Sequence, residues 1–442
     1  MPTQHLERRL GLDSAVAVIV GEVIGVGIFL TPAGMARELG SPLWILAVWI
    51  AVGAATVCGA LSYGALAARF PEAGGGYVYL RQAWGRGCAF LYGWKSMLVL
   101  DPGLTAAFAA GLAAYVSFIV PLSAPGEKAV AIAAVLGLAL ANVLGARVGP
   151  GLLRAVAALK LGLLAVIVLW GFLSGRGDAA HFVPFAGRRP GSADLLPGLA
   201  TGLLAAFFCF AGFWDVAKLG AEVRDPARTL PRALALAIAI VTAVYLSVTA
   251  VFVYLVPIEA AHSADAFAGL VGASLFGSAG GRLFAAVVVV AVLGSLAAVL
   301  LAAPRVYLAM ARDGLFLRSI GQLHPRLGTP VRATAIQTAL ACTLILLGNF
   351  NEIVGYFIFV TFAFVALTVA GLFRLPRQAP GAYRAPGHPF TPAAFLALLL
   401  VLLVLLAAGS PRQSAAGCLV VAAGIPVYLV VSRRRAGRAI SP

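Results

Sequence analysis

Charged side chains are scarce in this sequence, where Asp, Glu, Lys and Arg together make up 11% of the 442 residues. A soluble domain is typically about a quarter charged, so these few charges cannot cover a water-facing surface. Hydrophobic residues instead form 62% of the chain, and the mean hydropathy is +0.99. These values exclude a soluble protein of this length and indicate one membrane domain covered by lipid.

Acidic residues are the scarcer charge sign, with 16 Asp and Glu against 32 Lys and Arg. The resulting net charge of +16 would suit a nucleic-acid-binding protein, but most basic residues fall in alternate loops between apolar runs. This pattern is typical of membrane orientation, and it places both ends of the chain in the cytoplasm. We therefore expect a multi-pass protein of the cytoplasmic membrane, with the lipid bilayer as partner and no nucleic acid.

Metal-binding and catalytic patterns are absent from the sequence. The five cysteines have neither metal-ligand nor CxxC spacing, and we expect them to pack as small apolar residues. The five histidines fall near the N-terminus or in loops rather than at membrane depth. We therefore expect no metal and no cofactor, and a membrane-embedded enzyme is a remote alternative.

Long apolar runs dominate the rest of the sequence. A spanning helix needs roughly 20 mostly apolar residues, and this template predicts twelve helices. The runs do not alternate with period two, which excludes the strands of a membrane barrel. The first run has no small-residue cleavage site, so it is a retained helix and not a signal peptide. The predicted helices cover 14–38, 42–68, 87–119, 128–146, 151–174, 194–222, 230–256, 282–311, 331–348, 351–373, 390–409 and 415–432.

Two of the predicted helices are broken. Gly25-Val26-Gly27 interrupts the first helix, and Ala211-Gly212 interrupts the sixth. Paired breaks at matching positions point to a transporter binding site, because free backbone groups survive only around a protein-enclosed cavity. The alternative for the first break alone is that its glycines only permit close helix packing. The second break favours the binding site.

Broken helices suit a zwitterionic ligand. A free helix N-terminus offers N–H groups and partial positive charge, whereas a free C-terminus offers carbonyls and partial negative charge. We expect the N–H groups of Val26 and Gly27 to hold a carboxylate, with Gly25 and Gly27 letting the ligand approach the backbone. The carbonyls expected to hold an ammonium group are those of Val23, Phe208, Cys209 and Ala211.

Five motifs occur in order along nearly the whole chain. They are GEVIGVGIFLTPAGMA, FPEAGGGYVYLRQAWG, FAGFWDVAKLGAEVRDPARTLPRAL, RVYLAMARDGLF followed by HPRLGTP, and YRAPGHPF. Together they resemble the amino acid–polyamine–organocation superfamily, in particular the prokaryotic relatives of the L-type amino acid transporters.

The resemblance implies a leucine-transporter-type fold within a single transmembrane domain, 1–442, and alternating access around a midplane site. Two inverted five-helix repeats, 14–174 and 194–373, would be followed by two extra helices within 390–432. In that family an aromatic side chain of the sixth helix closes over the substrate, and the matching position is Phe208. Val26 stands where serine is common and Phe213 where tryptophan is frequent, which leaves the choice of substrate open.

Lys160 lies in the middle of the fifth predicted helix, beyond snorkelling reach of either end. The resemblance implies that this lysine takes the place of the sodium ion of sodium-coupled relatives. We expect it to tether the first helix through carbonyls near Gly21, and the alternative is that it carries a coupling proton. The inner half of the eighth helix supplies only the Ser295 hydroxyl, which argues against a sodium site.

Two acidic residues, Glu22 and Asp101, also lie within predicted helices. They could pair with Lys160 or Lys95, carry protons, or recognise a cationic substrate, and the balance of embedded charges favours pairing. Lys218 has Asp215 three residues before it and Glu222 four residues after it. We expect a local helical salt bridge there.

These features predict a sodium-independent secondary transporter of amino acids, working by proton symport or by exchange. The small or apolar Cys209, Ala211 and Phe213 favour neutral L-amino acids. The alternatives are a cationic amino acid or polyamine transporter of the same fold, a sodium-coupled transporter, and a channel. The expected ligands are an amino acid and protons, and no pattern indicates an oligomeric state.

Overall fold

The part of the chain that the computed structural model describes is built from helices. It comprises residues 8–25, 27–144, 150–260, 264–317, 319–348, 350–376 and 383–439. Within these ranges no strand forms, and one isolated bridge pairs Leu10 with Val223. The all-helical class predicted from the apolar runs is confirmed.

The helices follow one another closely along the chain. Those of the first part are α1 (Leu12–Val23), α2 (Gly27–Leu39), α3 (Pro42–Arg69), α4 (Gly76–Trp84), α5 (Arg86–Lys95), the π-helix η1 (Ser96–Leu100), α6 (Asp101–Ile119), α7 (Ala124–Val143), α8 (Pro150–Leu173) and η2 (Ala179–Phe182). Those of the second part are α9 (Leu195–Phe210), η3 (Phe213–Glu222), α10 (Pro226–Leu255), η4 (Ile258–Ala260), α11 (Ala264–Phe276), η5 (Gly277–Ala279), α12 (Gly280–Ala302), α13 (Pro304–Arg312), α14 (Val331–Leu347), α15 (Phe350–Arg374), α16 (Phe390–Gly409) and α17 (Pro411–Ala439).

Many of these helices can cross a membrane. Nine helical stretches of the described chain are long and apolar enough to do so. Two shorter apolar helices, Val331–Leu347 and Ile358–Arg374, accompany them. The lengths agree with the roughly 20 residues that a bilayer core requires. The protein is therefore a multi-pass membrane protein.

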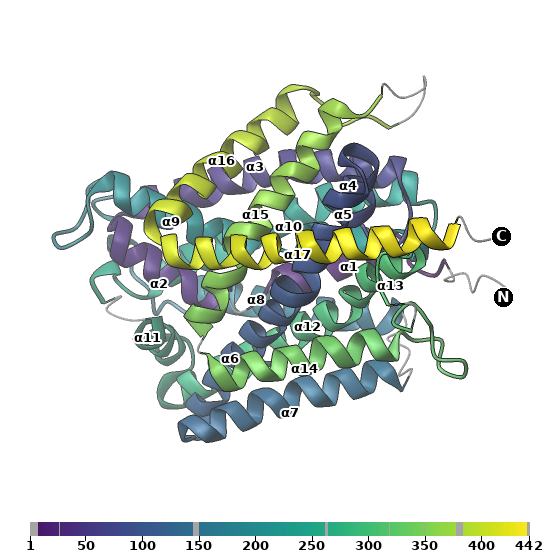
Figure 1. The fold of residues 1–442 in the computed structure, drawn as a ribbon. Coiled ribbons are helices and arrows are strands. Elements are labelled where there is room, and N and C mark those ends of the chain that lie inside the picture. Colours follow the sequence, from purple (N-terminus) through teal and green to yellow (C-terminus); the bar gives the residue numbers. More distant parts are fainter. Residues whose placement is uncertain are drawn as a thin grey trace.

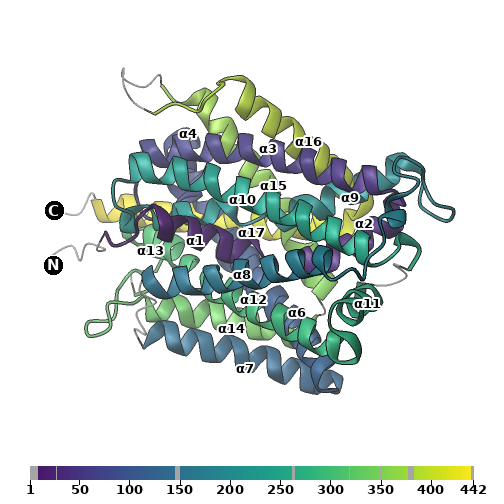
Figure 2. The ribbon, with the colours of Figure 1, turned by 180° about the vertical axis from the view of Figure 1, so that it is seen from behind.

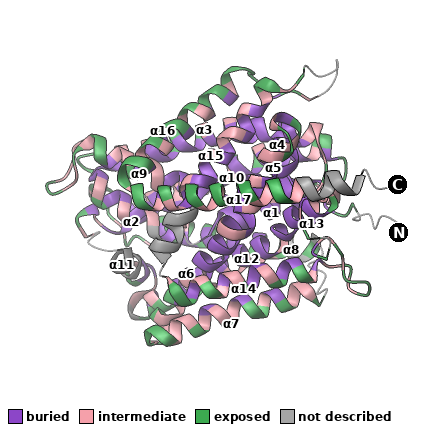
Figure 3. Cartoon of the chain, in the orientation of Figure 1, coloured by how far each residue is buried: buried purple, intermediate pink, exposed green. Residues whose placement is uncertain are grey.

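Most of the long helices run in the same general direction, and both ends of the described chain lie at one end of the bundle (Figure 1, Figure 2). We call this the terminal end. In the centre, α1 packs against α10 and α12, α3 against α10, and α6 against α12. Figure 3 shows buried residues gathered there and exposed residues on outer helices such as α7 and α17. Exposed leucines such as Leu140 and Leu419 identify those outer surfaces as lipid-facing.

Both helix breaks lie where the glycines predict them. α1 ends at Val23, Ile24 leaves the helical region with φ −76° and ψ 80°, and α2 begins at Gly27. α9 ends at Phe210, and Gly212 takes a left-handed φ of +100° before η3 begins. A side chain at that φ would be strained, so glycine permits the chain to turn there.

Several local features differ from the predicted helix ranges. α4 and α11 contain 9 and 13 residues and lie outside the predicted spans. A template of roughly 20 apolar residues cannot detect helices this short. The predicted helix over 87–119 contains a π-helical turn, η1, which directly precedes Asp101. The turn directly precedes a buried carboxylate, and such rare π-turns inside α-helices are frequently found at functional sites.

Candidate functional site

The two breaks bring neighbouring helices into close contact in the centre of the bundle. α2 packs against α9, and α1 packs against η3. A Cβ atom at Gly27 would lie 2.7 Å from Cys209 Sγ, and Thr31 Oγ1 lies 3.1 Å from the same sulfur. A Cβ atom at Gly25 would lie 2.8 Å from the Phe108 ring. Glycine is therefore the residue that fits at both positions.

Tyr245 of α10 joins the two breaks. Its hydroxyl donates to the carbonyl of Val23 at 2.9 Å and to the carbonyl of Cys209 at 2.8 Å. Trp49 and Phe210 pack against its ring, with centroids 5.0 Å and 5.2 Å away. Two carbonyls predicted to hold an ammonium group thus already accept a hydrogen bond. The Val23 carbonyl also accepts from the Gly25 N–H at 2.8 Å, so of the two it is the Cys209 carbonyl that keeps a second lone pair for a ligand.

The other predicted binding residues fall into two environments. Phe208 and Ala211 are half-buried, and the Phe208 carbonyl accepts a hydrogen bond from the Ala211 N–H at 3.1 Å. Phe213 is fully buried in an aromatic cluster with Tyr63 of α3 and Phe395 of α16, at centroid distances of 5.8 Å and 6.1 Å. Val26 lies outside the described residues.

Lys160 of α8 forms a buried cation site with α1 and α12. Its Nζ atom donates to the carbonyl of Gly21 at 2.7 Å, to that of Ile24 at 2.6 Å, and to Ser295 Oγ at 3.0 Å. An ammonium group has three donors, and all three are used. The two carbonyls belong to the C-terminal end of α1, where orphan carbonyls and the helix dipole attract a cation.

A second buried charge cluster links η3, α6 and α13. Lys218 Nζ lies 2.8 Å from Asp215 Oδ2 and 3.1 Å from Asp101 Oδ1. The Tyr307 hydroxyl donates to Asp101 Oδ2 at 2.8 Å. Both carboxylates and the ammonium group are buried, so each hydrogen bond offsets a large desolvation cost.

The partners expected for several charged residues were wrong. Asp101 pairs with Lys218 rather than with Lys160 or Lys95. Lys95 Nζ instead lies 4.8 Å from the centroid of the Tyr92 ring, a cation–π contact. Of the two partners expected for Lys218, only Asp215 contacts it, because Glu222 pairs with Arg305 of α13 at 3.0 Å. Helical spacing alone cannot reveal such contacts between helices.

Glu22 is buried beside the second break without a hydrogen-bond donor. The residue is 1% exposed, and neither carboxyl oxygen has a hydrogen-bond partner among the described residues. A Cβ atom at Gly212 would lie 3.2 Å from Glu22 Oε1, so the carboxyl lies directly against the turn of the broken helix. The sequence distance between Glu22 and Gly212 gave no indication of this contact.

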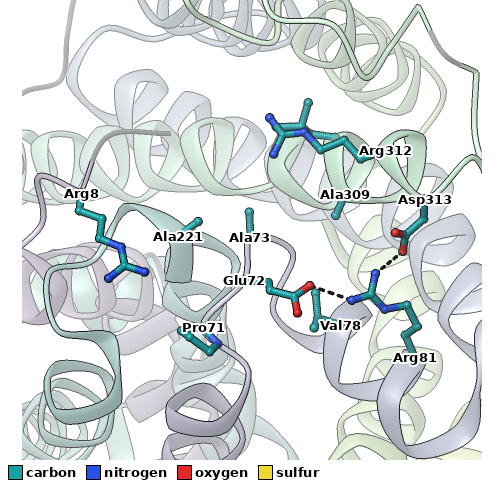
Figure 4. Close-up of a pocket in the computed structure, with 11 residues that line it drawn as sticks. Arg8, Pro71, Glu72, Ala73, Val78, Arg81, Ala221, Ala309, Arg312 and Asp313 are labelled. Atoms are coloured by element: carbon teal, nitrogen blue, oxygen red, sulfur yellow. Dashed lines mark hydrogen bonds and ion pairs between the residues drawn. The ribbon is translucent and has the colours of Figure 1, made fainter. Parts of the chain in front are cut away.

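The terminal end of the bundle is closed by ion pairs and main-chain bonds. Arg81 of α4 lies 2.7 Å from Glu72 and 2.5 Å from Asp313, and these residues line a pocket of about 390 Å³ away from the breaks (Figure 4). The N–H groups of Arg9 and Leu10 donate to the Glu222 carbonyl at 2.9 Å and 3.0 Å.

Tyr77 of α4 also contributes to this closed end. Its hydroxyl donates to Asp313 Oδ2 at 2.8 Å. Burial, and then the hydrogen bond to this carboxylate, raise the pKa of Tyr77 far above its usual value. The hydroxyl therefore stays protonated and remains a donor to Asp313 at physiological pH.

Comparison with known proteins adds a family to this geometry. A family model described as amino acid permease matches residues 10–431. The chain belongs to the amino acid permease family. The permease is thus a membrane transporter and not an enzyme.

Several curated relatives of the permease cover it from end to end. The serine/threonine exchanger SteT of Bacillus subtilis is 28% identical over 98% of this chain and 98% of its own length. An uncharacterized transporter of Mycobacterium tuberculosis is 36% identical over 97% of this chain and 93% of its own. The human cystine/glutamate transporter is 26% identical over 96% of this chain and 85% of its own.

Sequence reasoning missed two tyrosines of the permease, Tyr245 and Tyr307. Each lies in a mostly apolar run and is fully buried. A buried tyrosine normally finds a hydrogen-bond partner, and that preference was the available signal. The signal does not say which carbonyl or carboxylate the hydroxyl reaches, because the partners come from helices distant in the sequence.

Proposed function

We propose that this permease moves amino acids across the cytoplasmic membrane by alternating access, without sodium, by proton symport or by exchange. The observation that carries this proposal is the contact between the broken helices α1/α2 and α9/η3. Two interrupted helices bring backbone N–H groups and carbonyls that are not part of regular helix together in one buried region. A zwitterion such as an amino acid is the small ligand that matches both.

The proposed architecture is the leucine-transporter type with twelve membrane helices. The interrupted pair α1/α2 forms the first, and the remaining spans follow in the order of the chain. The inverted repeats are 14–174 and 194–373, followed by two extra helices within 390–432. The terminal end of the bundle faces the cytoplasm, which agrees with the basic residues concentrated in the loops assigned to that side.

In the proposed binding mode, the substrate lies between the two breaks. Its carboxylate accepts from the N–H groups of Val26 and Gly27, and its ammonium group donates to carbonyls at the ends of α1 and α9. Tyr245 satisfies two of these carbonyls when no ammonium group is present. Phe208, half-buried beside the second break, acts as the gate that covers the substrate. The carbonyls concerned are those of Val23, Phe208, Cys209 and Ala211.

Lys160 supports sodium-independent transport. Its ammonium group is surrounded by the oxygens of Gly21, Ile24 and Ser295, which is the kind of ligand set that a hard cation prefers. A covalently attached cation already fills this position. We propose that Lys160 replaces a bound sodium ion and holds the end of α1 against α8 and α12.

Neutral L-amino acids are the favoured substrates. Cys209 and Ala211 beside the second break are small and uncharged, and such residues do not anchor a charged side chain. SteT is named for the exchange of serine and threonine, two neutral amino acids. The acidic Glu22 at the same break favours the second candidate, a cationic amino acid or a polyamine.

Uptake into proteoliposomes tests the proposed function. A panel of labelled neutral, acidic and cationic amino acids and polyamines would be offered with an inward proton gradient, with sodium, or to vesicles preloaded with unlabelled amino acid. We expect neutral amino acids to enter without sodium. Failure of every panel member to enter would contradict the proposed function. The Thr31→Val and Gly27→Ala variants test the site, and we expect only Gly27→Ala to block uptake, because its Cβ would meet Cys209.

A further inference from the structure

Two buried carboxyl groups at the junction of α1 and η3 lack hydrogen-bond donors. Both oxygens of Glu22 and Oδ1 of Asp215 have no partner among the described residues. The residues are 1% and 2% exposed, so solvent does not compensate for the missing donors. An ionised carboxylate in such a place is costly unless it is paired and hydrogen-bonded.

The other two residues considered for coupling are already matched. The three donors of Lys160 have three acceptors, and a neutral amine there would lack the charge that its carbonyl partners favour. Asp101 accepts from Lys218 on one oxygen and from Tyr307 on the other. Glu22 is therefore the coupling candidate with unmet hydrogen-bonding capacity.

Glu22 of α1 and Asp215 of η3 lie beside the same turn of the broken helix. A Cβ atom at Gly212 would lie 3.2 Å from Glu22 Oε1, and the Asp215 N–H donates to the Gly212 carbonyl at 2.8 Å. Ionised carboxylates only accept, so two of them can share a hydrogen bond only when one carries a proton. We propose that Glu22 and Asp215 hold one proton between them, and that the permease takes up and releases this proton with each amino acid it moves. The proposal rests on the proposed transport function and assigns the coupling to this pair.

The groups around Glu22 do not remove the need for this proton. The ammonium group of Lys218 donates to Asp101 and Asp215. Lys160 and the hydroxyls of Tyr245 and Ser295 donate to carbonyls of α1. The buried charged and polar groups on the elements around Glu22 are Asp215 and Lys218 of η3, Asp101 of α6, Lys160 of α8, Tyr245 of α10 and Ser295 of α12.

The proton links the charge of the pair to the contact between two helices. With the proton present, one carboxyl donates to the other and α1 stays against η3. Without it, two negative charges face each other in the low-dielectric core and repel. The same two helices lead to Leu10 and Val223, which pair at the terminal end. Release of the proton to water on that side thus favours opening of the bundle at the terminal end. The release breaks one bond, the O–H bond of a carboxyl group.

Proton-driven accumulation tests the proposal in the intact permease. An imposed difference of about one pH unit supports about tenfold accumulation of a neutral substrate per co-transported proton, with the membrane potential clamped. We expect wild type to approach that ratio and to acidify the vesicle lumen as substrate enters. Glu22→Gln should reduce the accumulation ratio to about one, while counterflow falls by a much smaller factor. The matched control is Asp13→Asn, an exposed carboxylate on the same helix.

A second measurement does not depend on transport. Infrared spectra of the purified wild type should contain the carbonyl band of a protonated carboxylic acid, and Glu22→Gln and Asp215→Asn should each lose it. The same spectrum in wild type and both variants would overturn the shared proton. If variants fail to fold, loss of this band from wild type at alkaline pH supports the pair, and its absence at neutral pH overturns it.

The remaining outcomes separate this proposal from the proposed function. Net uptake of amino acid by wild type without any proton movement would overturn the coupling and leave the transport function intact. Glu22→Gln that keeps proton-driven accumulation but loses affinity for cationic substrates would also overturn it, and would assign Glu22 to substrate recognition. Absence of amino acid counterflow in wild type would overturn both.

Discussion

Replacement of Lys160 by alanine is the most direct test of how the core is held together. The substitution removes three hydrogen-bond donors at once. Two of them form the hydrogen bonds from Lys160 of α8 to the carbonyls of Gly21 and Ile24. Ser295 still donates to the Gly21 carbonyl at 2.8 Å. The C-terminal end of α1 therefore loses its hydrogen bonds to α8 but keeps one to α12.

The size of the effect follows from these contacts. Hydrogen bonds to charged groups contribute about 1.5–3 kcal/mol each, so two of them amount to roughly 3–6 kcal/mol. The contacts hold α1 in the closed arrangement and change when it opens. We expect about half of the lower figure, about 1.5 kcal/mol, to affect the transport barrier. This corresponds to a rate loss of about tenfold.

Initial rates of uptake into proteoliposomes measure this loss, with size-exclusion chromatography to show that the variant is folded. The matched control is Lys128→Ala, because Lys128 is a partly exposed lysine whose Nζ atom donates to one carbonyl, that of Leu346, at 2.6 Å. We expect the control to transport nearly as well as wild type. If Lys160→Ala transports at the rate of Lys128→Ala, the tether has no role in the cycle.

Three further substitutions test the breaks, and a fourth, Gly277→Ala, is the control for Gly212→Ala. Tyr245→Phe removes the donor of the buried Cys209 carbonyl and one of two donors of the Val23 carbonyl. It should lower the free energy of unfolding by about 1–3 kcal/mol, measurable as a lower Tm. Gly212→Ala brings a Cβ to 3.2 Å from Glu22 Oε1 at a φ of +100° and should abolish uptake. Gly277→Ala, at φ +71° with nothing within 4 Å, should cost only about 1–2 kcal/mol of backbone strain and keep uptake. Phe208→Ala should slow turnover more than it weakens substrate binding, and unchanged turnover would argue against the gate.

The broad fold was predictable because lipid imposes a simple rule on sequence. A helix must cross about 30 Å of hydrocarbon with its backbone bonds closed, so length and apolarity reveal the spans. Gly25, Gly27 and Gly212 indicated the breaks, since glycine permits backbone that other residues resist. α4 and α11 were not predicted, because neither is long enough to produce the signal that the spans share.

The site was predictable only where it depends on the backbone. The breaks indicated which carbonyls and N–H groups become available, but not that Tyr245 already binds two of them. The pairing of Asp101 with Lys218 joins residues 117 positions apart, and Glu222 meets Arg305 across 83 positions. Such contacts depend on how helices pack around one another. Local spacing therefore gave the local pair of Lys218 with Asp215, which is confirmed, but not the partners that come from other helices.

The main-chain pairing of Leu10 with the segment after η3 has a consequence for mutational tolerance. The N–H groups of Arg9 and Leu10 donate to the Glu222 carbonyl, and the Arg224 N–H donates to the Leu10 carbonyl at 2.8 Å. Ordinary side-chain replacements leave these atoms in place. Proline alone among the standard residues lacks the donor, so a proline at position 224 would remove a bond that other substitutions retain. Genetic screens that exchange single residues would therefore underestimate how much these main-chain hydrogen bonds contribute.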